Sequence, residues 1–213
     1  MTMPMSVWPW TAAHGALMFI MWLVMMTAMM LPSAAPVVLL YSTISRRSNG
    51  TTSIAPSLFA LGYIVTWGCF SLAAVLTQFF LEWAGLLSPM MEATSTRLSG
   101  ALLITAGLYQ FTALKHSCLR LCRSPLEFLM SRWRSGKLGA FEMGVRHGIY
   151  CVACCWGLML LLFVGGVMNL MWVVGLALYV LVEKLVPGGQ RIGHAAGVLL
   201  VGTGIVLLAT SLP

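Results

Sequence analysis

Six apolar stretches, separated by short polar segments, dominate the chain. They cover about residues 16–41, 57–81, 98–114, 148–164, 167–186 and 194–212. A helix needs about 20 apolar residues to cross a bilayer, and these stretches approach or exceed that length. The pattern predicts an all-α fold: a polytopic membrane protein whose six-transmembrane-helix bundle forms a single transmembrane domain over residues 1–213.

Glycine and proline pairs refine this pattern. The chain is apolar for about 39 residues over 148–186, which is nearly twice the length that crosses a bilayer. We therefore expect two spans there, with a hairpin at Gly165 and Gly166, because glycine tolerates turn dihedrals. Pro32 and Pro36 lie within the first stretch and predict a kink, since each removes a backbone donor.

The composition supports a membrane protein. The chain is 60% hydrophobic and 8% charged, with a mean hydropathy of +0.93. A soluble domain of this size has too little interior to bury so much apolar surface. A net charge of +7 would suit a nucleic-acid partner, but the placement of the basic residues explains it better, so we expect no nucleic acid.

Basic residues predict the orientation. Eleven of the twelve Lys and Arg residues fall in connections that six spans place on one side, and only Arg97 lies opposite. The eleven are Arg46, Arg47, Lys115, Arg120, Arg123, Arg132, Arg134, Lys137, Arg146, Lys184 and Arg191. By the positive-inside rule the basic loop 115–146 is cytoplasmic and both termini are outside, in the periplasm, for a multi-pass protein of the bacterial inner (plasma) membrane. The first apolar run is too long for a signal-peptide core, so we expect no cleavable signal peptide.

The cysteines gather around the basic loop. Cys118 and Cys122 are four residues apart, which places both sulfurs on one face of a helix. Cys151, Cys154 and Cys155 form a second group after the loop. Thiolates suit Cu(I) or Zn(II), and a cytoplasmic position favours ligation over disulfides.

Packing is the alternative interpretation of these cysteines. A single buried cysteine ordinarily behaves as a small hydrophobic residue, but five at this spacing are harder to explain in that way. His116 and His147 flank the two groups and are further candidate ligands, because imidazole is a common metal ligand. We expect the two cysteine groups to form one metal site.

A methionine face marks the first span. Of the 16 methionines in the chain, several repeat at helical spacing: Met21, Met25 and Met29 on one line, Met26 and Met30 on another. Thioethers bind Cu(I) but hardly interact with hard ions, so these residues form a candidate outside-to-inside route. Methionine is also an ordinary filler of irregular cores, and that alternative stays open.

Four polar residues in or near the spans are candidates for a pathway, because such groups usually face the interior of a bundle. They are Gln110, Asn169, Glu183 and Lys184.

The chain resembles a bacterial family of integral membrane proteins of unknown function that are predicted to bind metal. The resemblance covers nearly all of residues 22–184 and includes the stretches 22–33 and 109–115. Its motifs are Cys118-Leu119-x-x-Cys122-Arg123-x-Pro125, Gly144-x-x-His147-Gly148-x-x-Cys151-x-x-Cys154-Cys155-Trp156-x-Leu158-Met159, Gly166-x-Met168-Asn169-Leu170-x-Trp172, and Glu183-Lys184. The resemblance implies a membrane-embedded metal site.

Ligand chemistry favours a protein that handles copper, as Cu(I), by moving it inward or delivering it for cuproprotein assembly. Expected partners are the bilayer, the metal ion, and a cuproprotein, metallochaperone or other membrane subunit. One alternative is a membrane thiol- or haem-linked oxidoreductase, although no residue is assigned a catalytic role. The other is an assembly subunit with a structural zinc site.

Overall fold

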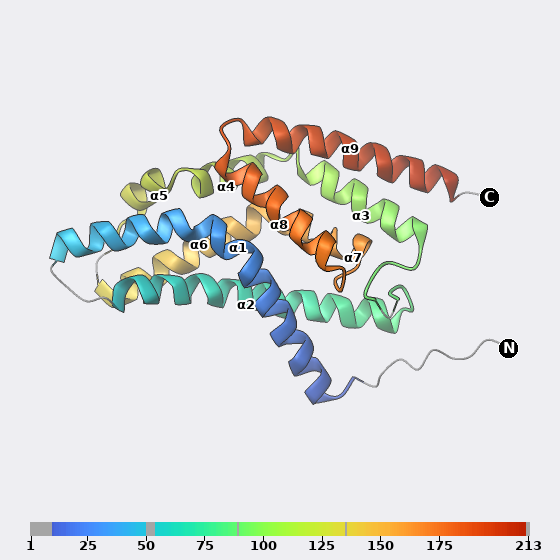
Figure 1. Cartoon of the computed structure of the whole chain (residues 1–213), viewed down its shortest axis with the longest axis horizontal. Coiled ribbons are helices and arrows are strands. Elements are labelled where there is room, and N and C mark those ends of the chain that lie inside the picture. Colours follow the sequence, from blue (N-terminus) through green and yellow to red (C-terminus); the bar gives the residue numbers. More distant parts are fainter. Residues whose placement is uncertain (1–9, 50–53, 89, 135, 212–213) are drawn as a thin grey trace.

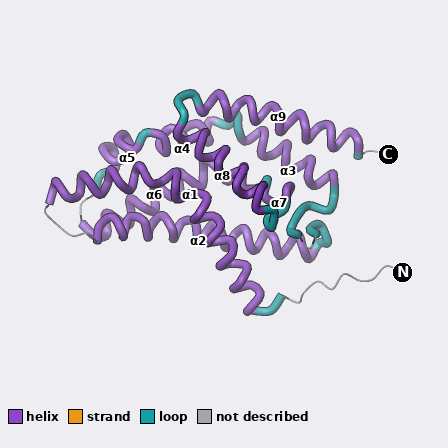
Figure 2. The backbone as a smooth tube through the Cα atoms, viewed as in Figure 1, coloured by secondary structure: helices purple, strands orange, loops and turns teal. Residues whose placement is uncertain are grey.

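The structure is a computed structural model that describes residues 10–49, 54–88, 90–134 and 136–211. Its regular elements are α-helices, in the order α1 (Ala12–Asn49), α2 (Ile54–Trp83), α3 (Thr96–Tyr109), α4 (Ala113–Arg123), α5 (Pro125–Arg132), α6 (Gly136–Met159), α7 (Leu162–Gly165), α8 (Leu170–Leu185) and α9 (Gly189–Thr210). Short connections join them (Figure 2). The predicted all-helical fold is confirmed for this part of the chain.

Four helices are long and apolar enough to cross a membrane. They lie at 12–45, 55–83, 136–165 and 189–210. The other two predicted spans correspond to shorter helices, because α3 has 14 residues and α8 has 16. The count of six crossings is therefore not established by helix length, and the last residue of the sixth predicted span, Leu212, lies outside the described residues.

The third predicted span ends early. It was expected to reach residue 114, but α3 stops at Tyr109 and α4 begins at Ala113. Thr112 separates them in an extended conformation, with φ −72° and ψ 142°, and its hydroxyl oxygen accepts from the Lys115 amide. Such a capping residue begins a new helix instead of continuing the old one.

The segment 115–146, predicted as a basic loop, is mostly helical. It contains nearly all of α4, all of α5 and the first turns of α6. Pro125 stands in the first turn of α5, where its missing amide costs nothing. Helix α6, which contains most of the fourth predicted span, therefore begins at Gly136. This is twelve residues before residue 148, where that span was expected to begin.

Close helix pairs form the scaffold. Helix α2 runs along α6, and α3 runs along α9 (Figure 1). Gly144 lets α6 approach the backbone of α2, since a Cβ at this position would collide with the carbonyl oxygen of Phe59. Helix α1 continues through Pro32 and Pro36 and changes direction about midway along its length.

The connections cluster at two opposite ends. At one end, the α2–α3 connection pairs with the α7 turn, where the Ala93 amide donates to the Phe163 carbonyl at 2.7 Å. The chain reverses there at Gly166, whose φ is +85°, which is one of the two glycines at which the hairpin was expected. At the other end, Arg123 Nη2 donates to the Val186 carbonyl at 2.6 Å. Successive long helices run in opposite directions (Figure 1).

Candidate metal site

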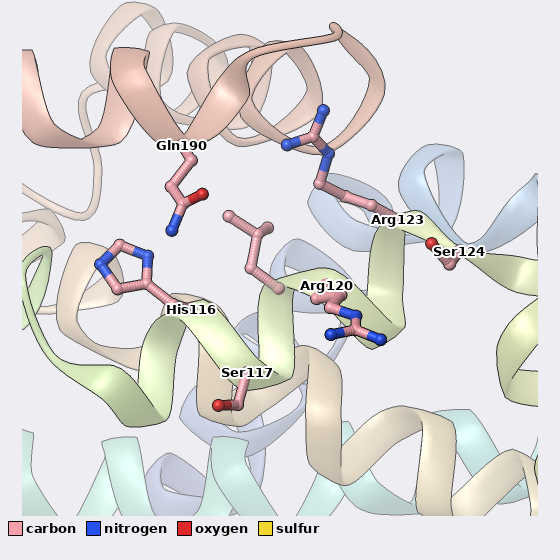
Figure 3. A pocket seen from close by; sticks show the side chains of 7 residues that line it. His116, Ser117, Arg120, Arg123, Ser124 and Gln190 are labelled. Atoms are coloured by element: carbon pink, nitrogen blue, oxygen red, sulfur yellow. The ribbon is translucent and has the colours of Figure 1, made fainter.

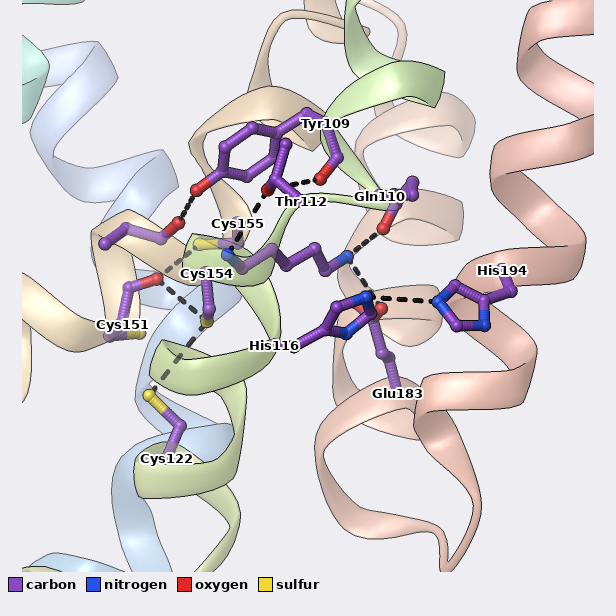
Figure 4. A network of polar contacts seen from close by, with 12 residues as sticks. Tyr109, Gln110, Thr112, His116, Cys122, Cys151, Cys154, Cys155, Glu183 and His194 are labelled. Carbon is purple, nitrogen blue, oxygen red and sulfur yellow. Dashed lines mark hydrogen bonds and ion pairs between the residues drawn. The ribbon is translucent and has the colours of Figure 1, made fainter.

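Two helices bring the two cysteine groups together. Helix α4 has one buried face, made of Lys115, Cys118, Leu119 and Cys122, and this face packs on α6. On α6 all three cysteines are buried, each with 1% of its surface exposed. The sulfurs of Cys122 and Cys154 lie 4.0 Å apart (Figure 4). Thiols that are 32 residues apart in sequence thus become neighbours.

The separation of these two sulfurs fits a shared metal ion. With metal–thiolate bonds of about 2.3 Å, two sulfurs 4.0 Å apart subtend an angle of about 120° at the ion. That angle belongs to a trigonal site with three sulfur ligands. Cys151, whose carbonyl oxygen accepts from the Cys154 thiol at 3.1 Å, is the candidate for the third thiolate.

The thiols are paired with protein groups in this structure. The Cys154 and Cys155 sulfurs donate to the Cys151 carbonyl at 3.1 and 2.9 Å. All six cysteines are free, and Cys69 is exposed on α2. Within the described residues, no three His, Cys, Asp or Glu side chains are already arranged around a metal position. An ion would therefore have to replace these thiol hydrogen bonds.

The cysteines of α4 are free, buried thiols: Cys118 is 6% exposed and Cys122 is 8% exposed. Since a metal binds the thiolate, binding at these residues must release protons.

A buried cation lies against the cysteines. Lys184 on α8 is 5% exposed, and its ammonium nitrogen is 3.0 Å from the sulfur of Cys151. The same nitrogen lies 3.3 Å from Ser33 Oγ and 3.9 Å from Met30 Sδ. Tyr63 places its hydroxyl 3.1 Å from the Cys151 sulfur. A positive charge and a hydroxyl group thus contact one thiol, an environment that stabilises a thiolate.

The methionine face of α1 is turned partly inward. Met26 and Met30 are fully buried and Met29 is 7% exposed. Met21 and Met25 are partly buried and pack against the same core. Met30 contacts Lys184, which in turn contacts the Cys151 sulfur.

A buried ion pair joins α4 to α8. Lys115 Nζ is 2.7 Å from Glu183 Oε1, and both side chains are almost fully buried. Gln110 also accepts a hydrogen bond from Lys115. These polar candidates thus join α4 to α8 (Figure 4).

The remaining sequence candidates are dispersed. His147 is buried among aromatic rings, with its ring centroid 5.2 Å from Phe128 and 5.8 Å from Tyr63. Asn169 is exposed and caps α8, where its side-chain oxygen accepts from the Trp172 amide at 3.2 Å. His116 faces α9 and pairs with His194.

Four residues near the site were not predicted: Ser33, Tyr63, Lys115 and His194. Ser33 and Lys115 lie within the stretches that carry the family resemblance, and this was an available signal. No local sequence pattern links Tyr63 to the cysteines or His194 to His116. Each of these contacts joins helices that are far apart in the sequence.

These features define a class: a helical protein with membrane-length apolar segments and a buried thiol-rich site. The chain belongs to the PpoB2 family, described as copper chaperones, whose sequence profile matches residues 19–207. This family is described more specifically than the metal-binding family of unknown function that the sequence resembles. The match supports a copper-related function. The description gives no support to zinc or haem. No curated protein and no solved structure matches the chain.

Proposed function

We propose that this protein is a membrane-embedded chaperone that holds Cu(I) between α4 and α6 and delivers it to a cuproprotein. The observation that carries the proposal is the 4.0 Å separation of the Cys122 and Cys154 sulfurs. Cys122, Cys151 and Cys154 are the three primary ligands in this proposal. Cys118 and Cys155 are adjacent thiols through which the ion can be exchanged.

The softness of the thiolate ligands and the nearby Lys184 charge favour Cu(I) as the bound ion. Soft thiolates bind reduced copper strongly, and three thiolates around one Cu(I) leave a net negative charge. A buried negative charge is costly unless a cation compensates it. Lys184, which contacts the Cys151 sulfur at 3.0 Å, is placed to compensate it.

The membrane arrangement we propose has six crossings with both termini outside. The clustering of connections at two ends supports it, and so does the division of basic residues. Helix α3 has 14 residues and is about 21 Å long at 1.5 Å per residue, which is too short to cross the apolar part of a bilayer. We therefore treat α3 and α4 as one interrupted membrane-spanning segment. Irregular backbone at membrane depth is tolerated where protein buries it, and Gln110 in this break is 1% exposed.

The methionines of α1 would supply the outer part of the route. Met21, Met25 and Met29 lie on one line of the helix, and Met26 and Met30 on another. Thioethers bind Cu(I) reversibly and leave the thiolates as the tighter site. Copper would thus move from the outer half of α1 towards Met30 and then to the cysteines.

Purified protein in detergent, titrated with Cu(I) against a coloured Cu(I) chelator, tests this function. We expect one tightly held copper per chain in the wild type and its loss or marked weakening in Cys122→Ser. Cys69→Ser is the matched control, because Cys69 is exposed and away from the site. Wild-type copper content and affinity in Cys122→Ser would refute the site.

A further inference from the structure

A pair of histidines joins α4 to α9. The Nε2 atoms of His116 and His194 lie 3.1 Å apart, and the two rings are nearly perpendicular, at 83° (Figure 4). Phe111 stacks on the His194 ring with a centroid separation of 5.4 Å. The stacked aromatic ring limits rotation of His194 and fixes the direction of its Nε2 atom.

His116 retains an unused polar atom and lines a cavity. Within the described part of the chain, the buried Nδ1 atom of His116 has no hydrogen-bond partner. His116 also lines a cavity of about 500 Å³, together with Ser117, Gln190 and other residues of α4 and α9 (Figure 3). A hydrogen-bonded pair that only tied two helices together would not need such a cavity beside it.

We propose that His116 and His194 form a second metal site, which binds copper through two imidazoles and exchanges it with a partner through the cavity. This inference rests on the proposed function and adds a place where the ion enters or leaves. With metal–nitrogen bonds of about 2.0–2.1 Å, the 3.1 Å separation of the Nε2 atoms gives an angle of about 100° at the ion. Four-coordinate geometry accepts that angle.

The incomplete ligand set is what makes the pair suited to transfer. The chain supplies two imidazoles, which leaves two positions of a four-coordinate ion for ligands of an incoming protein or small molecule. Binding requires a lone pair on both Nε2 atoms. The ring that donates through Nε2 therefore takes its other neutral tautomer, with its proton on Nδ1, and the net charge of the pair is unchanged.

The basic residues around this point have partners of their own. Arg120 Nη2 lies 2.8 Å from Glu127 Oε1, so that its charge is paired. Arg123 donates to the Val186 carbonyl, and its guanidinium group is held by the α8–α9 connection. Lys115 is neutralised by Glu183.

X-ray absorption at the copper edge, after one and then two equivalents of Cu(I), tests the second site. We expect sulfur ligands for the first equivalent and additional nitrogen ligands with the second. His194→Ala and His116→Ala should each remove the nitrogen signal while the first equivalent keeps its sulfur shell. His14→Ala, a histidine on α1, is the matched control. His194→Gln, which keeps a polar side chain but lacks the imidazole, should also lose the signal and guards against a folding defect in the alanine variant.

The outcomes separate the two proposals. A second equivalent that is absent, bound only by sulfur, or unchanged in His194→Ala and His194→Gln overturns the histidine site and leaves the cysteine site intact. A first equivalent without sulfur overturns the proposed function, whatever the second equivalent shows.

Discussion

The ammonium nitrogen of Lys184 lies 3.0 Å from the sulfur of Cys151, in the interior of the helix bundle. A cation at this distance stabilises the thiolate form and therefore the copper complex. We expect Lys184→Met to weaken Cu(I) binding at least about tenfold, which corresponds to about 1.4 kcal/mol. Two unit charges about 4 Å apart interact by about 4 kcal/mol at an effective dielectric of 20. The expected loss of binding free energy is smaller than this interaction energy.

Competition with a Cu(I) chelator measures this effect, and Lys137→Met is the control because Lys137 is exposed at the start of α6. Unchanged or tighter binding in Lys184→Met would show that the ammonium group does not support the copper complex.

The methionine route predicts a loss of copper supply without loss of the cysteine site. In Met25→Leu/Met29→Leu, size and apolarity are kept but two sulfurs are removed. We expect cellular copper content of the protein to fall to below about half, since leucine cannot ligate Cu(I), while Cu(I) affinity of the purified protein stays unchanged. Met130→Leu/Met171→Leu, at two highly exposed methionines, is the control. Equal copper content in both double variants would eliminate the route.

The six-crossing topology predicts opposite labelling of two engineered cysteines. Glu92 and Arg134 are both exposed, and the topology places Glu92 outside and Arg134 inside. In a Cys69→Ser background the other cysteines are buried, so a membrane-impermeant maleimide on intact cells should label Glu92→Cys but not Arg134→Cys. Disruption of the cells should make Arg134→Cys reactive. Labelling of both residues in intact cells would contradict the topology.

Helix contact at Gly144 predicts a large effect of a single methyl group. A Cβ there meets the backbone of Phe59, which cannot move as a side chain can. We expect Gly144→Ala to destabilise the protein by about 1–3 kcal/mol, the usual range for overpacking, seen as a lower midpoint of thermal unfolding in detergent. Gly175→Ala is the control, because nothing lies within 4 Å of its Cβ position, and alanine favours a helix. An equal or higher midpoint for Gly144→Ala would disprove the close contact.

Local patterns predicted much of the fold. Apolar length marked the long helices, and the glycine pair at 165 and 166 marked the turn after α7. The interruption at Gln110–Thr112 was not visible, because the local sequence remains compatible with a helix and tertiary contacts decide it. The charge of the segment 115–146 predicts a loop, but α4, α5 and the start of α6 are helical and bury residues such as Leu119 and Phe128 against other helices.

The candidate site was predictable where helical spacing decides it. Cys118 and Cys122 share a face because they are four residues apart, and the two cysteine groups were expected to form one site. The contacts of Lys184 with Cys151 and of His116 with His194 join residues 33 and 78 positions apart. No periodicity in one sequence specifies such pairs, since they depend on how α8 and α9 pack against the rest.

The sulfur coordination of the first bound copper tests the central claim most directly. Copper-edge X-ray absorption of the protein with one equivalent of Cu(I) should show about three sulfur ligands near 2.3 Å. Cys122→Ser on α4 and Cys154→Ser on α6 should each lower the sulfur count by one, while Cys69→Ser keeps it. A wild-type shell in Cys122→Ser, or a first shell without sulfur, would contradict an ion held between the two helices.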